Sequence, residues 1–339
     1  MKIFNILMNR ELGGAKQTFL DYNNALVSKS CKVINITSSF AQVNDRKSKF
    51  IKLPNLASWC ILSRLYLKLL IIFYKPDLLI VHGGRAVKFA YDANINNIPI
   101  LGVTHSYSIR HILKCDYIIA LDILLKKHLV KNGYSVSRIF IIPNMVHTPL
   151  KKSNITFVKK PSYIIGALGR LVPEKGFNYL IEAIHILKDR KYNVKLIIGG
   201  SGRLEDRLKK LAVDINIGKN VEFIGWIKEK QTFFEGLDIF CIPSVFETCS
   251  IVSLEAMSQQ VAIVCTKTLG SSQIFESGVN ALVTKTASSQ ELADQIAYLI
   301  DNPNKRKELI NNAYNKIINE YDSHVVSNKL VKALKNILV

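Results

Sequence analysis

Two glutamates, Glu247 and Glu255, lie eight positions apart around the predicted start of a helix. Residues 237–243 form a short apolar run that a proline ends, which predicts a buried strand. Apolar residues then recur at helical spacing, with Ser250 as the expected N-cap. We therefore expect Glu247 in a loop at the carboxyl end of a strand and Glu255 in the early turns of the following helix. Open α/β sheets bind ligands at that edge.

The backbone amides of Ser250, Ile251 and Val252 form the next part of this candidate site. Amides at a helix start lack intrahelical acceptors and carry the positive end of the helix dipole, which suits a phosphate. Two carboxylates would repel a ligand made of phosphate alone. They are consistent with a ligand that carries sugar hydroxyls on both sides of a diphosphate, so the pattern predicts a nucleotide-sugar site. The alternative is that both glutamates are solvated charges beside a core helix.

Two cations, Arg170 and Lys175, lie in one glycine-punctuated loop after a predicted strand at 163–168. Arginine offers a planar fork of donors for phosphate oxygens, and lysine offers a compact charge. The alternative is that both are exposed loop cations in a basic chain. No Asp-x-Asp occurs and no residues have metal-ligand spacing, so we expect a metal-independent site without a cofactor.

The pair Glu247 and Glu255, followed by Ala256-Met257, resembles the paired-glutamate motif of the retaining glycosyltransferases of family four, which have the GT-B fold. Gly169-Arg170 and Lys175-Gly176 are similar to the phosphate loop of the same family. The resemblance covers nearly the whole chain. It implies an α/β protein with two Rossmann-like parallel-sheet domains facing a central cleft, and a C-terminal helix that crosses back to the first domain.

The resemblance also implies roles for a catalytic set. Arg170 and Lys175 would neutralise the donor diphosphate. Glu247 would face the donor sugar, and Glu255 would hold the ribose hydroxyls. His105 follows a predicted strand, and by resemblance it contacts the donor sugar close to the reacting carbon. The alternative for His105 is a purely structural histidine.

Further donor-binding positions follow from the resemblance. They lie in glycine loops, at a strand end and at the helix start, and are Gly13, Gly14, Gly200, Trp226, Ser250, Ile251, Val252 and Glu255. His82 is a second histidine at a strand end, for which a structural role is again the alternative. Gln273 stands where the chain departs from the family pattern, so it receives no role.

Alternating strand and helix patterns indicate how the chain is divided. Strand-like runs at 2–7, 32–37, 77–81, 99–103, 117–120 and 138–142 are separated by helical patterns, which predicts a parallel sheet. A polar, proline-ended stretch at 151–161 is the expected linker. We therefore expect a first domain of residues 1–150 with a returning helix at 322–339, and a nucleotide-sugar-binding domain at 151–321. The six cysteines form no C-x-x-C pair, and together with the absence of a signal peptide they predict buried thiols in a cytoplasmic protein.

The chain of 339 residues carries a net charge of +20, and this charge is distributed unevenly along the sequence. Residues 1–150 hold 20 Lys and Arg against 7 Asp and Glu, which favours an anionic partner. Nucleic-acid-binding motifs are missing. Four cations at 46–52 precede an apolar, aromatic helix pattern at 57–74, which suits the surface of an anionic membrane. The alternative is a helix packed on the sheet; the two are compatible if only part of the helix packs.

These features together predict a glycosyltransferase that moves a hexose-type sugar from a nucleotide-diphosphate donor to an acceptor hydroxyl. The resemblance implies that the transfer retains the anomeric configuration. The expected acceptor is a lipid-linked or lipopolysaccharide-type glycan of the cell envelope, at the inner face of the cytoplasmic membrane. Three alternatives stay open: a soluble transferase that makes a small glycoside, a nucleotide-sugar epimerase, and a non-catalytic nucleotide-sugar-binding scaffold.

Overall fold

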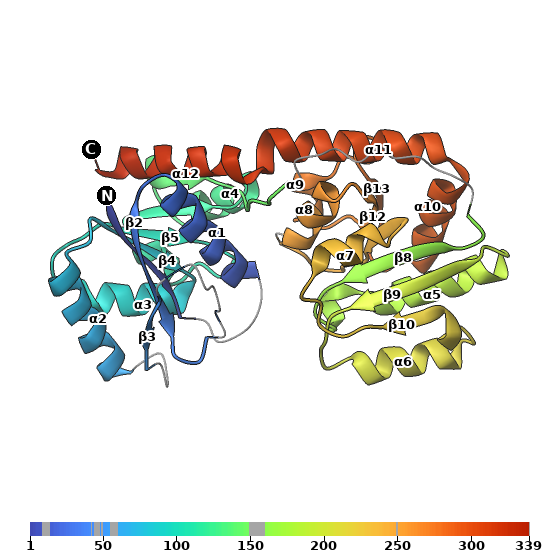
Figure 1. The fold of residues 1–339 in the computed structure, drawn as a ribbon, viewed down its shortest axis with the longest axis horizontal. Helices are drawn as coiled ribbons and strands as arrows, with labels where there is room; N and C mark the ends of the chain where they lie inside the picture. The colour runs from blue at the N-terminus through green and yellow to red at the C-terminus, as the bar shows by residue number, and fades with distance from the viewer. Residues whose placement is uncertain are drawn as a thin grey trace. The chain divides into compact units, whose positions relative to one another are not determined.

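The computed structural model describes residues 1–8, 14–41, 43, 48, 50–54, 60–148, 160–248 and 250–338 (Figure 1). The chain divides into two compact units: unit 1 comprises Met1–Met145 and Ser323–Val339, and unit 2 comprises Val146–Asp322. Each unit contains its own parallel sheet with helices, which confirms the α/β fold class predicted from the sequence. The expected linker lies almost entirely outside the described residues, as does Gly13.

In the described part of unit 1, the strands form one sheet in the order β3-β2-β1-β4-β5-β6-β7, and every pairing is parallel. The strands are β1 Lys2–Leu7, β2 Lys32–Ser38, β3 Phe50–Leu53, β4 Leu78–His82, β5 Ile100–Val103, β6 Tyr117–Ala120 and β7 Ile139–Ile141. The helices are α1 Gly14–Ser28, α2 Ile61–Tyr74, α3 Gly84–Ala93 and α4 Ile123–Lys131, with short 3-10 turns η1 Ile112–Lys114 and η2 Val136–Arg138. Strands β1 and β4 are buried almost end to end, as expected where helices cover both faces of a parallel sheet.

Unit 2 repeats this design with the strand order β10-β9-β8-β11-β12-β13, again with parallel pairings. The strands are β8 Tyr163–Leu168, β9 Val194–Gly199, β10 Val221–Phe223, β11 Ile239–Ile242, β12 Ala262–Thr266 and β13 Leu282–Thr284. The α-helices are α5 Phe177–Asp189, α6 Glu205–Asp214, α7 Lys230–Glu235, α8 Ile251–Ser258, α9 Ser271–Ile274, α10 Ser289–Asp301 and α11 Pro303–Lys316. Two 3-10 turns, η3 Pro173–Lys175 and η4 Gly218–Asn220, and a π-helical turn, η5 Ile317–Tyr321, complete the unit.

Strand β11 separates the two hydrophobic cores of unit 2. Its side chains alternate, so Ile239 and Cys241 join the core beneath α5 and α10, while Phe240 joins the core on the face of α8. Phe234 from α7 packs edge-on against Phe240 in that second core, with ring centroids 5.2 Å apart. This alternation leaves only the carboxyl end of the strand open to a ligand.

The C-terminal helix α12, Ser323–Leu338, belongs to unit 1, where it packs against α1. Val326, Leu330, Leu334 and Ile337 follow the spacing of a single helical face. Among the described residues, no helix is both long and apolar enough to cross a bilayer.

We predict that Leu330→Ala destabilises unit 1. Leu330 is fully buried on α12, so truncation leaves a cavity and should lower the free energy of unfolding by about 2–5 kcal/mol. Denaturant unfolding followed by circular dichroism measures the change. The control is Lys329→Ala, which alters an exposed neighbour on the same helix and should change stability by less than about 0.5 kcal/mol. Equal midpoints for Leu330→Ala and the parent protein would contradict this account of α12.

Candidate functional site

The loop after β11 leads directly into α8, as the sequence predicts. Ser250 caps the helix, since its hydroxyl oxygen accepts a hydrogen bond from the Ser253 amide at 3.2 Å. The amides of Ile251 and Val252 open the helix and have no intrahelical acceptor. The N-terminus of α8 therefore presents donors and a positive dipole end to the space in front of it.

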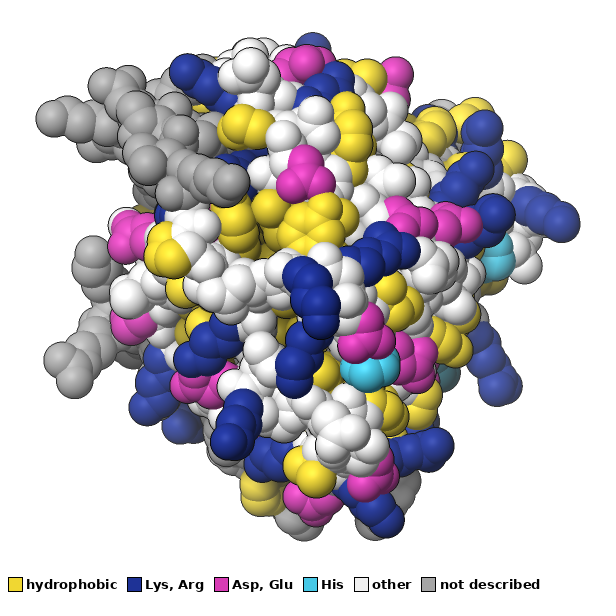
Figure 2. Space-filling model, turned by 90° about the vertical axis from the view of Figure 1, so that its right-hand side faces the viewer, with side chains coloured by type: hydrophobic (Ala, Val, Ile, Leu, Met, Phe, Trp, Pro, Cys, Tyr) yellow, Lys and Arg dark blue, Asp and Glu magenta, His cyan; other side chains and the backbone are white. Residues whose placement is uncertain are grey.

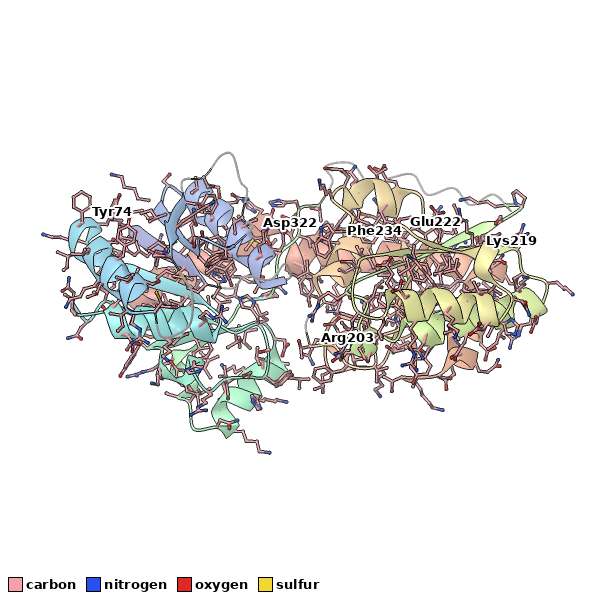
Figure 3. All side chains as sticks on the ribbon, turned by 90° about the horizontal axis from the view of Figure 1, so that it is seen from below. Tyr74, Arg203, Lys219, Glu222, Phe234 and Asp322 are labelled. Atoms are coloured by element: carbon pink, nitrogen blue, oxygen red, sulfur yellow. The ribbon has the colours of Figure 1, made fainter. Side chains whose placement is uncertain are left out.

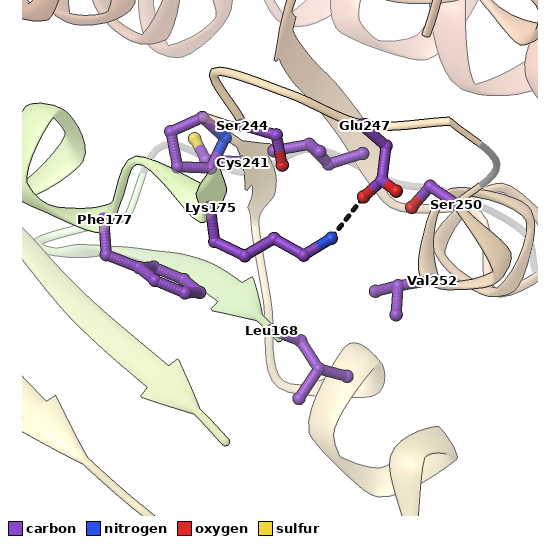
Figure 4. A pocket seen from close by; sticks show the side chains of 10 residues that line it. Leu168, Lys175, Phe177, Cys241, Ser244, Glu247, Ser250 and Val252 are labelled. Atoms are coloured by element: carbon purple, nitrogen blue, oxygen red, sulfur yellow. Dashed lines mark hydrogen bonds and ion pairs between the residues drawn. The ribbon is translucent and has the colours of Figure 1, made fainter. Parts of the chain in front are cut away.

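A pocket with about 250 Å³ of empty volume, including its opening, lies in front of this helix end (Figure 4). Its lining combines apolar walls with a few polar groups: Leu168, Lys175, Phe177, Cys241, Ile242, Pro243, Ser244, Glu247, Ser250 and Val252. The ammonium of Lys175 and the carboxylate of Glu247 point toward each other and form an ion pair, with the Ser250 side chain beside Glu247. An apolar pocket with convergent polar groups is the usual form of a small-molecule site.

The Lys175–Glu247 pair is mostly shielded from water. The side chains are 23% and 12% exposed, so the lysine neutralises a carboxylate that would otherwise be costly to bury. An ammonium has three donors, and Glu247 uses only some of them. Lys175 can therefore bind a second anion without releasing the glutamate.

Direct backbone packing brings the two loops of this pocket together. Gly176 has a φ of +63°, and a Cβ there would lie 2.1 Å from the carbonyl oxygen of Pro243. The amides of Val245 and Phe246 donate to the carbonyl of Glu174, at 2.9 and 3.2 Å. The loop after β8 and the loop after β11 are thus joined on both sides of Lys175, which fixes the lysine opposite Glu247.

Arg170 and Gly200 lie in two further loops at the same sheet edge. Arg170 is exposed at the carboxyl end of β8. Gly200 follows β9 with a φ of +124°, and a Cβ there would lie only 1.9 Å from the carbonyl oxygen of Gly169. The Gly200 amide also donates to the Gly225 carbonyl at 2.6 Å, next to Trp226, which is 50% exposed. The ends of the neighbouring strands β10, β9, β8 and β11 therefore carry the predicted residues of unit 2 side by side.

Glu255 on α8 has its own cationic partner, Lys230 at the start of α7, with 2.6 Å between Nζ and Oε1. The second oxygen, Oε2, is buried and has no hydrogen-bond partner among the described residues. Burial raises the pKa of Glu255, and Lys230 offsets part of that rise. An unsatisfied buried acceptor is costly, and a ligand hydroxyl would satisfy it. Lys230 was not predicted from the sequence, because a separation of 25 residues between Lys230 and Glu255 gives no sign of this contact.

The predicted residues of unit 1 form a separate group. Gly14 begins α1 at the carboxyl end of β1, whereas Gly13 is not among the described residues. His105 follows β5 and is half-buried, and its Nε2 lies 3.3 Å from Nδ1 of the fully buried His82. Burial lowers the pKa of both rings, that of His105 to about 4, so His105 is neutral at physiological pH.

Within the described ranges, no three His, Cys, Asp or Glu side chains gather where they could hold a metal ion. Gln273 lies in the short helix α9 and receives no role. The chemistry that the residues of unit 2 can offer is therefore anion binding by Arg170, Lys175 and the α8 amides, and hydroxyl binding by two carboxylates.

We predict that Glu255→Gln stabilises the ligand-free protein. The folded pKa of Glu255 is above its ordinary 4.5, so ionisation costs stability as pH rises through that window, and the cost persists at neutral pH. The variant should unfold at a higher temperature than the parent at pH 7, and the difference should vanish below about pH 4. Thermal unfolding measured across pH tests this expectation. Glu222→Gln, which changes an exposed acid paired with Lys195, is the control and should show little pH-dependent difference.

Comparison with known proteins supports the family suggested by these residues. Residues 150–316 match the family model described as glycosyl transferases group 1. CapM of Staphylococcus aureus, a capsular polysaccharide biosynthesis glycosyltransferase, is 25% identical over 50% of this chain and 45% of its own. An uncharacterised glycosyltransferase of Haemophilus influenzae is 27% identical over 89% of this chain and 91% of its own. For CapM and two other curated relatives the match covers only 43–49% of the relative, so this chain spans about half of their length.

Solved structures extend the likeness to the whole fold. The structure of Anabaena Alr3699/HepE in complex with UDP-glucose is similar over 99% of this chain and 100% of that one, with a TM-score of 0.84 and 19% identity. At that identity the comparison shows the fold alone. Residues 150–316 belong to the glycosyl transferases group 1 family, and the chain has the GT-B fold, with two Rossmann-like parallel-sheet domains.

Proposed function

We propose that this protein is a retaining glycosyltransferase that moves a hexose-type sugar from a UDP-sugar donor to an acceptor hydroxyl. The observation that carries the proposal is the edge of the unit 2 sheet, where Arg170, Lys175 and the start of α8 lie with two lysine-paired carboxylates. The UDP moiety is suggested by the likeness to HepE, whose structure contains UDP-glucose.

In this proposal the diphosphate binds to cations and amides. Arg170, Lys175 and the amides of Ile251 and Val252 take up the negative charge that develops as the bond from the anomeric carbon to the diphosphate oxygen breaks. Such electrostatic stabilisation is often the largest single contribution to catalysis. The Gly200 loop permits close backbone approach, and Trp226, half-exposed beside it, borders the base.

The hydroxyl groups of the donor bind to acids and to a histidine. Oε2 of Glu255 accepts from the ribose, Glu247 accepts from the transferred sugar, and His105 contacts the same sugar. The acceptor oxygen forms its bond to the anomeric carbon on the face that the diphosphate leaves, and the acceptor proton passes to a diphosphate oxygen. Inversion at the anomeric carbon would contradict this route.

We further propose that unit 1 binds an anionic bilayer through α2, at the inner face of the cytoplasmic membrane, where the acceptor is a lipid-linked or envelope glycan. One face of α2 is packed, with Leu67, Leu70 and Ile71 buried. The opposite face exposes an apolar stripe whose members are 53–78% exposed: Leu62, Leu65, Leu69 and Phe73. An apolar stripe of this size on a surface helix needs a partner.

Charge favours an anionic lipid partner for that stripe. Lys68 and Lys75 lie on or beside α2, and residues 1–145 of this unit hold 20 Lys and Arg against 7 Asp and Glu. Arg64 on the same helix pairs with Asp92 at 3.1 Å. By contrast, the face of the molecule in Figure 2 shows acidic side chains interspersed with basic ones. Arg46, Lys47 and Lys49, predicted to assist, lie outside the described residues.

We predict that Arg170→Ala lowers kcat/KM by roughly 10²–10³-fold, because one charge-stabilising donor is lost. Release of UDP from a panel of UDP-sugars with a glycan acceptor measures the effect. Lys219→Ala is the matched control: Lys219 precedes β10 at the opposite sheet edge and should leave turnover unchanged (Figure 3). Near-normal activity of folded Arg170→Ala would remove the assignment. Incubation with donor alone separates an epimerase, which would isomerise the sugar, from a transferase.

We predict that vesicles containing anionic lipid bind the protein at low salt and release it as salt rises. Leu69→Gln together with Phe73→Gln removes two of the four members of the apolar stripe and should weaken binding about tenfold or more. Vesicle co-sedimentation measures the affinity. Val213→Gln, which replaces an equally exposed apolar residue on α6 of unit 2, is the control. Unchanged binding of the double variant would exclude α2 as the membrane surface.

A further inference from the structure

A continuous line of polar side chains runs through the interior of unit 1 and ends at His105. His105 follows β5, His82 ends β4, Asn5 lies on β1 and Asn35 lies on β2, which are four neighbouring strands of the sheet. The successive contacts measure 3.3, 2.9 and 3.0 Å. His82, Asn5 and Asn35 are at most 1% exposed. So many polar groups in a parallel-sheet core are unusual, because such strands are normally apolar.

The backbone carbonyl of Phe19 determines which side-chain atoms donate and which accept along this line of hydrogen bonds. The carbonyl oxygen of Phe19 can only accept, and the Asn5 side chain lies 3.0 Å from it, so the facing atom must be the amide Nδ2. The same nitrogen donates to Oδ1 of Asn35. Oδ1 of Asn5 therefore faces His82, and since this oxygen can only accept, Nε2 of His82 must carry a proton.

The positions of the protons on the two histidine rings follow from this orientation of Asn5. His82 packs edge-on between the rings of Phe19 and Tyr22, with centroids 5.5 and 5.3 Å away, and burial lowers its pKa far below 6.5. A neutral His82 with its proton on Nε2 has an acceptor at Nδ1. Nε2 of His105 must donate to that acceptor at 3.3 Å, and the two rings lie within 19° of parallel with their centroids 5.5 Å apart. A neutral His105 is left with an unprotonated Nδ1.

The hydrogen bonds beyond Asn5 continue in the same sense. Asn35 donates to Oδ1 of Asn23 at 2.8 Å, and Asn23 donates to the hydroxyl of Ser48 at 2.7 Å. Hydrogen bonds that all point one way polarise one another and strengthen the chain. To move the proton of His105 to Nδ1, His82 and Asn5 would have to reverse, and Asn5 would then turn its oxygen toward the Phe19 carbonyl.

We propose that His82 is a positioning residue that, anchored by Asn5, holds His105 in its Nε2–H tautomer, so that Nδ1 of His105 accepts a hydrogen bond from a hydroxyl of the donor sugar. The identity of the ligand rests on the proposed function, whereas the tautomer does not. His105 thereby selects sugars that carry a hydroxyl at the facing position.

Nuclear magnetic resonance tests the tautomer in the ligand-free protein. Protein labelled with ¹⁵N-histidine is measured at neutral pH, and His105→Gln and His82→Gln assign the signals. Long-range proton–nitrogen correlations distinguish the two tautomers of each ring. We expect Nε2–H for both His82 and His105. An Nδ1–H tautomer or a protonated ring at His105 would overturn the proposal, whatever the enzyme turns over.

Two substitutions test the specificity. The amide of His82→Gln offers a donor NH2 group and an acceptor oxygen, so it can still link Asn5 to His105. His82→Leu fills the space but has no hydrogen-bonding group. Donors that each lack one hydroxyl are compared with the complete sugar. The parent protein and His82→Gln should reject one of these analogues by roughly tenfold or more in kcat/KM, and His82→Leu should lose that discrimination.

Affinity for UDP alone provides the control, because it should be the same in all three proteins. Equal discrimination by His82→Leu and the parent would overturn the proposal. If His82→Leu fails to fold, the tautomer measured in the parent protein still decides the matter. If the tautomer is found but no nucleotide sugar is turned over, the proposed function fails while the role of His82 toward His105 stands.

Discussion

Contact between bare backbones at the carboxyl edge of the unit 2 sheet is the constraint on which the site depends. Gly176 lies against the Pro243 carbonyl, and Gly200 lies against the Gly169 carbonyl, at distances that admit no side chain. Because these loops touch, the groups that follow β8, β9 and β11 converge in a small volume. Lys175 reaches Glu247 only because Gly176 allows its loop to approach so closely.

Charge within this edge is balanced before any ligand arrives. Each glutamate has its own lysine, Lys175 for Glu247 and Lys230 for Glu255. Burying such pairs is costly unless the remaining lone pairs are satisfied, and Oε2 of Glu255 has no hydrogen-bond partner among the described residues. At the same sheet edge Arg170 adds an exposed positive charge. A diphosphate that carries hydroxyls can pair with both groups, which is why the proposed ligand suits the electrostatics better than phosphate alone.

Local patterns allowed much of this architecture to be predicted. The apolar run with its terminal proline correctly placed β11, and the capping serine correctly placed the start of α8. The ion-pair partner of Glu255 could not be predicted in this way, because tertiary packing decides it. Lys230 belongs to a different helix from Glu255, and no periodicity links them. The sequence alone gives no reason for an asparagine in each of the apolar strands β1 and β2. The reason is the register of the sheet, which places Asn5 beside Asn35.

The glycine at position 200 also limits how the proposed nucleotide site can be redesigned. The neighbouring Trp226 is 50% exposed, so a library that varies this position can sample side chains of different sizes. Substitutions of Gly200 would disrupt the loop, because even the Cβ of an alanine would lie 1.9 Å from the carbonyl oxygen of Gly169. If these loops bind the base as proposed, directed evolution of base preference can vary position 226 but must keep the glycine at position 200.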